Sequence, residues 1–303
     1  MDYKKRTPTY KIGSIQQNEI YIKRDDLIPY SFGGNKVRKA ELFFQEIENG
    51  NYDTVVTYGS SSSNHCRIIA NIAAAKRIHC HIISTESEET TINRKMVELF
   101  NADITVCDVA NVPQTIAHVM NDYSAKGRKV YFIQGGGHGN IGTKAYDLAF
   151  DEIVAYEQEQ KIAFDYIFHA SGTGTTQAGL ICGKKRCRSS AKIIGISIAR
   201  QNPRGGQIVF DSVKAYCGAD TKDDLFFIDD YICGGYGRYN KDVDMTIERV
   251  LTQYGIPLDP TYTGKAFWGM ERYIKLHQLK QKKILFIHTG GTPIFYDWMR
   301  KRI

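Results

Sequence analysis

The sequence predicts an α/β protein in which helices cover both faces of parallel sheets. Apolar, β-branched runs of about five to eight residues alternate with amphipathic stretches of about 10 to 20 residues. Strand–helix alternation of this kind is typical of doubly wound folds. The 303 residues can bury a sizeable core, either in one large domain or in two modest ones.

Strands are expected where the β-branched runs fall: Thr54–Tyr58, His79–Ser84, Asp103–Cys107, Lys129–Gln134, Tyr166–Ala170, Lys192–Ala199, Leu225–Ile232 and Lys283–His288. Helices fill the intervals between these runs. The first helix is expected from Lys36 to Glu48, because apolar residues recur there at helical spacing before the C-cap signal Asn49-Gly50.

Composition predicts a cytoplasmic protein that holds no metal and binds neither nucleic acid nor membrane. No apolar run approaches the ~18 residues that span a bilayer, and Met1–Arg6 lacks the apolar stretch of a secretory signal. The seven cysteines are scattered without a C-x-x-C pair, so we expect reduced thiols. The net charge of +7 is spread among acidic residues, which indicates solvated faces rather than a patch for polyanions.

A loop of the type that binds anions follows the expected strand Tyr166–Ala170. Glycines, hydroxyls and the start of a helix come together in Ser171–Gly179, which offers a nest of backbone N–H groups. Gln177 stands where a Rossmann fingerprint needs its third glycine, and the P-loop lysine is missing. The segment therefore predicts a phosphate site, with a turn that binds no ligand as the alternative.

A lysine at the start of a helix is the second candidate site. Lys36 follows Gly33-Gly34, which allow the backbone to approach a ligand closely. The positive end of the helix dipole is an unfavourable place for a cation, and a lowered amine pKa is what a Schiff-base lysine needs. Lys39 lies on the same side of the helix, where it can meet a phosphate. A surface lysine at a helix start is the alternative.

The loop Ser60–His65 follows a strand and precedes a helix. Its hydroxyls and amides suit a substrate carboxylate, although an N-cap with extra serines has the same composition.

Taken together, these segments resemble the D-cysteine desulfhydrase and 1-aminocyclopropane-1-carboxylate deaminase family, pyridoxal 5′-phosphate enzymes of the tryptophan synthase β-like fold (fold type II). The matching motifs run in family order over nearly the whole chain: Lys23–Asp26, Phe32–Lys39, Ser63–His65, Ser171–Leu180, Gly234–Gly237, Leu258–Ala266 and His288–Gly291. Each motif is weak alone, but the set at these intervals is specific.

The resemblance implies a role for each matching residue. Lys36 would form the Schiff base with pyridoxal 5′-phosphate and move the α-proton, and Asn64 would bond the cofactor's 3′-oxygen. The phosphate would be held by Gly172, Thr173, Gly174, Thr175, Thr176 and Lys39. The substrate carboxylate would lie near Ser63, Asn64 and His65, with Ser63 positioning the substrate. Tyr236 and Tyr262 would flank the substrate, with Tyr262 as the better proton donor.

Two threonines discriminate within the family. The deaminases carry Glu and Leu at the positions that are Thr263 and Thr289 here, whereas desulfhydrase-like members resemble this chain. A threonine hydroxyl near the pyridine nitrogen, with Thr289 favoured over Thr263, leaves that nitrogen less protonated than a carboxylate would. β-Elimination of a readily departing group tolerates that loss. The chain departs from the family at Ser61 and Ser62, where bulkier residues are usual, and at Thr175, where glycine is common.

The resemblance therefore predicts a lyase that converts D-cysteine, or a similar β-substituted amino acid, to pyruvate, ammonia and sulfide. The alternatives are an aminocyclopropanecarboxylate deaminase, a lyase or racemase for serine or cysteate, and a non-catalytic protein that binds the cofactor or an amino acid. The expected architecture is two doubly wound α/β domains with the cofactor cleft between them. The larger domain would comprise residues 1–48 and 165–303 and the smaller residues 49–164, in a homodimer.

Overall fold

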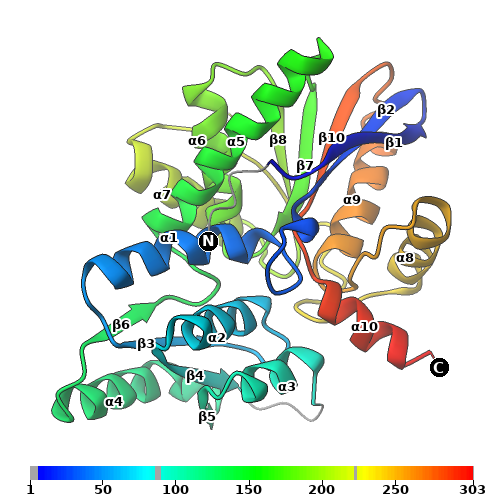
Figure 1. The fold of residues 1–303 in the computed structure, drawn as a ribbon. Coiled ribbons are helices and arrows are strands. Elements are labelled where there is room, and N and C mark those ends of the chain that lie inside the picture. The colour runs from blue at the N-terminus through cyan, green and yellow to red at the C-terminus, as the bar shows by residue number, and fades with distance from the viewer. Residues whose placement is uncertain (1–5, 86–89, 222–223, 303) are drawn as a thin grey trace.

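The protein folds around two separate sheets, which lie one above the other in Figure 1. The computed structural model describes residues 6–85, 90–221 and 224–302. The larger sheet has the strand order β1-β2-β10-β7-β8-β9, and the smaller has the order β5-β4-β3-β6. Both orders contain crossovers between parallel strands, so the doubly wound parallel architecture that the sequence predicts is confirmed.

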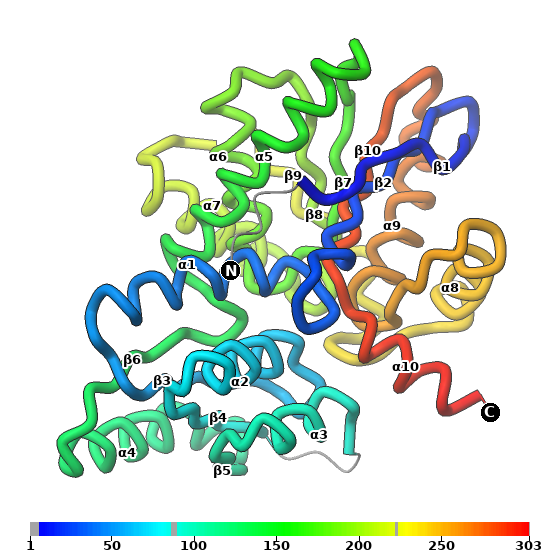
Figure 2. The backbone as a smooth tube through the Cα atoms, viewed as in Figure 1, coloured from blue at the N-terminus to red at the C-terminus, as the bar shows by residue number. Residues whose placement is uncertain are grey.

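The larger sheet consists of β1 (Thr9–Ile15), β2 (Asn18–Arg24), β7 (Tyr166–Ser171), β8 (Lys192–Ser197), β9 (Phe226–Ile228) and β10 (Lys283–His288). Every strand pair is parallel except β1 and β2, an antiparallel hairpin that sequence analysis missed. Gln16 and Gln17 make its turn with positive φ, in place of the usual glycine or asparagine. Figure 2 shows β2 beside β10, so the beginning and the end of the chain share one sheet.

Helices cover both faces of the larger sheet. On one face, α5 (Asn140–Gln160), α6 (Thr175–Arg186) and α7 (Arg204–Cys217) enclose a core that includes Phe150 and Ile167. On the other, α8 (Lys241–Tyr254), α9 (Thr263–Leu276) and α10 (Thr292–Arg300) enclose a second core around Phe267 and Phe286. None of the helices among residues 6–85, 90–221 and 224–302 is long and apolar enough to cross a membrane.

The smaller sheet consists of β3 (Thr54–Gly59), β4 (His79–Thr85), β5 (Asp103–Cys107) and β6 (Val130–Ile133). Its helices are α1 (Asn35–Asn49), α2 (Asn64–Lys76), α3 (Ile92–Leu99) and α4 (Val112–Ala125). Apolar residues of α1 and α2 share the core of this sheet, while α4 packs on its opposite face.

The boundary between the two expected domains stays a prediction. Helix α1 packs into the core of the smaller sheet, whereas α5 packs into a core of the larger one. A division at residues 49 and 164 would place α1 with the larger sheet and α5 with the smaller sheet, which is the opposite of how the two helices pack. The chain passes between the two sheets twice, first from β2 through α1 to β3 and later from β6 to α5 (Figure 2).

Candidate active site

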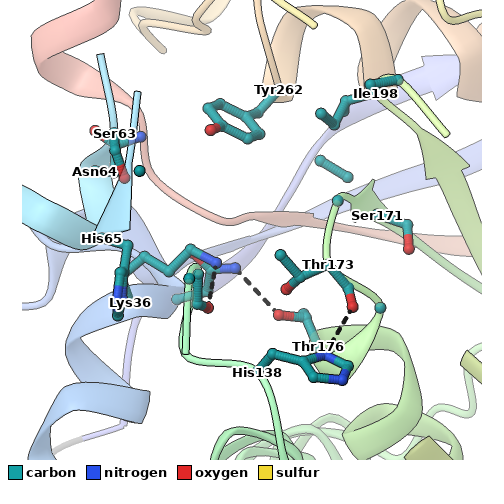
Figure 3. Close-up of a pocket in the computed structure, with 18 of the residues that line it drawn as sticks. Lys36, Ser63, Asn64, His65, His138, Ser171, Thr173, Thr176, Ile198 and Tyr262 are labelled. Atoms are coloured by element: carbon teal, nitrogen blue, oxygen red, sulfur yellow. Dashed lines mark hydrogen bonds between the residues drawn. The ribbon is translucent and has the colours of Figure 1, made fainter. Parts of the chain in front are cut away.

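A cavity of about 610 Å³ lies between the two sheets, at the carboxyl ends of several strands. Parallel α/β sheets bind ligands at this edge. The described residues that line the cavity are 35–36, 58–60, 63–65, 134–136, 138, 170–174, 176, 198–200, 204, 208, 236, 262 and 289–290. Figure 3 shows Lys36 extending between the start of α2 and the loop of Thr173 and Thr176, with Tyr262 on the opposite side.

The start of α1 is fixed by a close backbone contact. Gly34 has a φ of 101°, and a Cβ at this position would lie 2.8 Å from the carbonyl oxygen of Thr289. Glycine is therefore required, and the next residue, Asn35, donates its backbone N–H to that same oxygen at 3.0 Å. The end of β10 thus positions the first turn of α1, which carries Lys36.

Lys36 enters the cavity as an amine that loses its proton more readily than an ordinary lysine. Its Nζ donates to the carbonyl oxygen of Gly136 at 2.9 Å, as the dashed line in Figure 3 shows. Burial lowers the pKa of Lys36 to about 8. The lowered pKa that the sequence suggested is therefore present, and burial is its main cause. A neutral amine is the nucleophile that carbonyl chemistry requires.

The predicted anion loop forms the second wall. Gly172, Thr173, Gly174 and Thr176 line the cavity, whereas Thr175 does not. Asn35 links the two walls, because its Nδ2 donates to the Thr176 hydroxyl at 3.1 Å. Helix α6 begins at Thr175 with no side chain capping its first N–H groups, which suits an anion site at this loop.

Lys39 lies behind the loop rather than in the cavity lining. Its Nζ donates to the Thr175 hydroxyl at 2.6 Å, and the residue is 1 % exposed. Burial and the neighbouring Lys36 lower the pKa of Lys39 well below its ordinary value. No carboxylate among the described residues forms an ion pair with it. A buried amine in this situation is stabilised by an anion bound at the loop.

The loop before α2 forms the third wall. Ser63 caps this helix by accepting the backbone N–H of Cys66 at 3.2 Å. The Asn64 side-chain oxygen accepts a hydrogen bond from Asn93, and His65 Nε2 shares one with the Thr57 hydroxyl at 2.9 Å. Burial, with Lys36 and Lys39 nearby, lowers the pKa of His65 well below its ordinary value, so the imidazole is neutral. The structure brings all three predicted residues of this loop to the cavity.

Two tyrosines meet at the far side. The hydroxyls of Tyr236 and Tyr262 lie 2.7 Å apart, and Tyr236 also contacts the Ser60 hydroxyl at 3.1 Å. Burial, followed by the neighbouring Tyr236, raises the pKa of Tyr262 well above its ordinary value. Tyr262 therefore keeps its proton at neutral pH.

The structure separates the two discriminating threonines. Thr289 lines the cavity just beyond β10, but Thr263 does not line it. The Thr263 hydroxyl donates to Asp259 Oδ2 at 2.7 Å and accepts the backbone N–H of Asp259 at 2.9 Å. Thr263 therefore stabilises the turn that presents Tyr262, and it is Thr289 that can meet a ligand.

Three basic residues that sequence analysis missed also line the cavity: His138, Arg200 and Arg204. His138 Nδ1 lies 3.1 Å from the carbonyl oxygen of Thr173, and Arg200 donates to the carbonyl oxygen of Gly172. Both therefore hold the backbone of the anion loop. His138 follows a Gly-Gly-Gly turn and Arg200 follows β8, so their positions just beyond strand ends were the available signal.

Comparison with known proteins identifies the family. The family model described as "Pyridoxal-phosphate dependent enzyme" matches residues 1–290. The chain belongs to this family. It is a pyridoxal-phosphate-dependent enzyme. The D-cysteine desulfhydrases of Yersinia pestis (strain Pestoides F) and Serratia proteamaculans (strain 568) are each 34 % identical to it, over 96 % of this chain and 93 % of theirs.

A solved structure supports the same assignment. The protein described as the "ACC deaminase homologue" superposes with a TM-score of 0.91 and 30 % identity, covering 99 % of this chain and 93 % of that one. The pyridoxal-phosphate-dependent enzyme described here therefore has the fold type II architecture that the sequence predicted.

The residues present fit the cofactor of this pyridoxal-phosphate-dependent family. When the cofactor binds, Lys36 would supply the amine for the aldehyde, and the loop Gly172–Thr176 together with the buried amine of Lys39 would hold the phosphate. Asn64 and Thr289 line the same cavity and are suited to the polar edges of the ring. When bound, pyridoxal phosphate serves as an electron sink for the bonds to an amino acid's α-carbon.

Proposed function

We propose that the protein is a lyase that catalyses β-elimination from D-cysteine, or from a similar β-substituted amino acid, to give pyruvate, ammonia and sulfide. One observation carries the proposal: none of the described residues that line the cavity is Asp or Glu, and Thr289 stands beyond β10. A hydroxyl near the pyridine nitrogen provides weaker electron withdrawal than a carboxylate. Departure of a thiolate tolerates this, whereas opening a cyclopropane ring demands more.

The relatives favour the same substrate. The two proteins at 34 % identity are named D-cysteine desulfhydrase, and they match almost the whole chain. The solved structure at 30 % identity is described as an ACC deaminase homologue, which keeps a deaminase as the second candidate.

We assign each proposed catalytic role to residues in one wall of the cavity. Ser63, Asn64 and His65 present hydroxyl, amide and backbone groups for the substrate carboxylate at the start of α2. Lys36 Nζ takes the α-proton, since burial lowers the pKa of Lys36 to about 8 and leaves part of the population neutral at physiological pH. Tyr262 donates its phenolic proton to the departing group, with Tyr236 bonded to it at 2.7 Å.

A substrate panel tests the proposal. Purified protein with added pyridoxal phosphate is assayed for 2-oxo acid, ammonia and sulfide from D- and L-cysteine, D-serine, D-cysteate and 1-aminocyclopropane-1-carboxylate. We expect pyruvate and sulfide in equal amounts from D-cysteine. A 2-oxo acid formed only from the cyclopropane substrate would establish the deaminase instead, and 2-oxo acid from none of the substrates would overturn both.

We further propose that the protein acts as a homodimer in the cytoplasm. The resemblance to the desulfhydrase and deaminase family supports the dimer, and the scattered cysteines support a reducing compartment. Sedimentation equilibrium of the purified protein gives the oligomeric state directly.

A further inference from the structure

A row of hydroxyl groups leads from Tyr262 to the mouth of the cavity. The Tyr262 and Tyr236 oxygens lie 2.7 Å apart, Tyr236 and Ser60 lie 3.1 Å apart, and Ser60 and Ser62 lie 3.3 Å apart. Tyr236 is 41 % exposed, so the outer part of the row meets solvent. The rings of the two tyrosines pack edge to face at 5.9 Å, which holds their hydroxyls together.

The contact between Ser60 and Tyr236 crosses the cleft between the two sheets. Ser60 lies in the loop between β3 and α2 of the smaller sheet, whereas Tyr236 and Tyr262 lie in loops of the larger sheet. Ser60 therefore reaches across the cavity to the residue that contacts the proposed proton donor.

The hydrogen bonds along this row can all point the same way, with each hydroxyl donating to the next. Each hydroxyl donates one hydrogen bond and can accept others. If Tyr262 is to point its proton at the substrate, its own oxygen can accept a hydrogen bond only from Tyr236, whose oxygen is then free to accept one from another hydroxyl. Ser60 lies 3.1 Å from the Tyr236 oxygen, in position to be that donor. Hydrogen bonds that point the same way along a chain also strengthen one another.

We propose that Ser60 is a positioning residue that orients the hydroxyl chain Ser60–Tyr236–Tyr262 toward the substrate and so completes a proton relay. The proposal rests on the elimination reaction proposed above. As the O–H bond of Tyr262 breaks, its proton passes to the leaving group. Tyr262 receives the Tyr236 proton, Tyr236 receives the Ser60 proton, and Ser60 receives one from water at the mouth. One proton enters for each one delivered, and no oxidant or reductant is needed.

Three variants test the relay. Ser60→Ala removes the donor, and Ser60→Thr keeps a hydroxyl at the same place. Ser61→Ala alters the neighbouring serine, whose side chain lies outside the cavity lining found among the described residues. All three are assayed for pyruvate release from D-cysteine in light and in heavy water, once the wild type has been shown to be active.

The relay predicts a specific pattern in kcat. Loss of one hydrogen bond of ordinary strength lowers kcat of Ser60→Ala roughly two- to tenfold. The KM for the amino acid stays unchanged, and the solvent deuterium isotope effect on kcat increases because proton delivery becomes more limiting. Ser60→Thr restores both kcat and the isotope effect, and Ser61→Ala resembles the wild type. A change in KM alone, or equal behaviour of Ser60→Ala and Ser61→Ala, overturns the relay.

A measurement without cofactor or turnover tests the contact itself. Amide hydrogen–deuterium exchange is compared for the cofactor-free wild type, Ser60→Ala and Ser61→Ala. Loss of the contact speeds exchange at residues 234–237 across the cleft in Ser60→Ala only. Unchanged exchange there overturns the positioning role. If the wild type turns over none of the substrates, the proposed elimination reaction is wrong. The exchange measurement still tests the positioning role of Ser60, so the two outcomes can be told apart.

Discussion

Helix α1 carries three basic side chains in its first turns, Lys36, Arg38 and Lys39, and the two sides of the helix surround them differently. Arg38 contacts two carboxylates, with 2.9 Å between Nη2 and Asp25 Oδ1 and 2.6 Å between Nη1 and Glu152 Oε1. Although burial opposes it, these carboxylates raise the pKa of Arg38 well above its ordinary value. Lys36 and Lys39 meet only neutral oxygens in the hydrogen bonds described, and burial lowers the pKa of both.

This difference between Arg38 and the two lysines distinguishes a charged group that stabilises the fold from basic groups that are available to a ligand. Asp25 also accepts hydrogen bonds from Tyr146 at 2.6 Å and Thr7 at 2.8 Å, so the charge on the Arg38 side is fully partnered within the fold. On the cavity side, neither amine has a carboxylate partner among the described residues, and a phosphorylated aldehyde would provide interactions for both. Perturbed amines that lack partners in a cavity are typical of functional sites.

Replacing Lys36 is expected to have the largest effect. Lys36→Ala removes the amine that we propose attaches the cofactor and moves the α-proton, and loss of the acid–base role alone typically costs about 10²–10⁴ in rate. We expect the visible absorption band of the protein with pyridoxal phosphate to disappear and pyruvate release to fall to background. Lys144→Ala, which alters an exposed lysine on α5, serves as the control. If the Lys36→Ala protein keeps the absorption band, Lys36 is not the residue that attaches the cofactor.

The next largest effect is expected on the opposite side of α1. Arg38→Met leaves Asp25 and Glu152 partly or fully buried with a cation missing, a change that typically costs about 3–5 kcal/mol of unfolding free energy. Urea unfolding of the cofactor-free protein measures this loss. If Arg38→Met unfolds like the wild type but binds the cofactor poorly, the division between structural and functional charge is wrong.

Features that depend on local pattern could be predicted from the sequence. The order of strands from β3 onward, the anion loop and Lys36 all follow from periodicity, glycine placement and motif order, and the structure brings the loop and Lys36 to one cavity. The Arg38 cluster was beyond it, because Glu152 lies 114 residues away and only the folded chain brings α5 against α1. The same holds for Ser60, whose partner Tyr236 lies 176 residues along the chain. Lys39 was placed on the correct side of α1, but its depth behind Thr175 depends on packing.

Lys39→Met should have a smaller effect, and in a different measurement. A charge-assisted hydrogen bond typically contributes about 1.5–3 kcal/mol, so we expect the Kd for pyridoxal phosphate to rise tenfold or more. The cofactor-free protein should be no less stable to urea than the wild type, because methionine replaces a buried amine for which the described part of the chain offers no carboxylate partner. A stability loss as large as that of Arg38→Met would show that Lys39 belongs to the structural group.

The smallest effect is the pH dependence of cofactor capture by Lys36. Only the neutral amine attacks an aldehyde, and the pKa of Lys36 is about 8 instead of the ordinary 10.5. Below pH 8 the neutral fraction therefore rises about tenfold per pH unit, and above about pH 8 it levels off. Stopped-flow measurement of the visible band, after mixing cofactor-free protein with pyridoxal phosphate, should follow this curve.

Butylamine provides the reference for the same reaction, since its capture of the cofactor should keep rising to about pH 10.4, as for an ordinary lysine. A protein curve that also rises to that pH would mean that the Lys36 amine is as well solvated as a surface lysine. The contrast between the two sides of α1 would then lie in Lys39 alone.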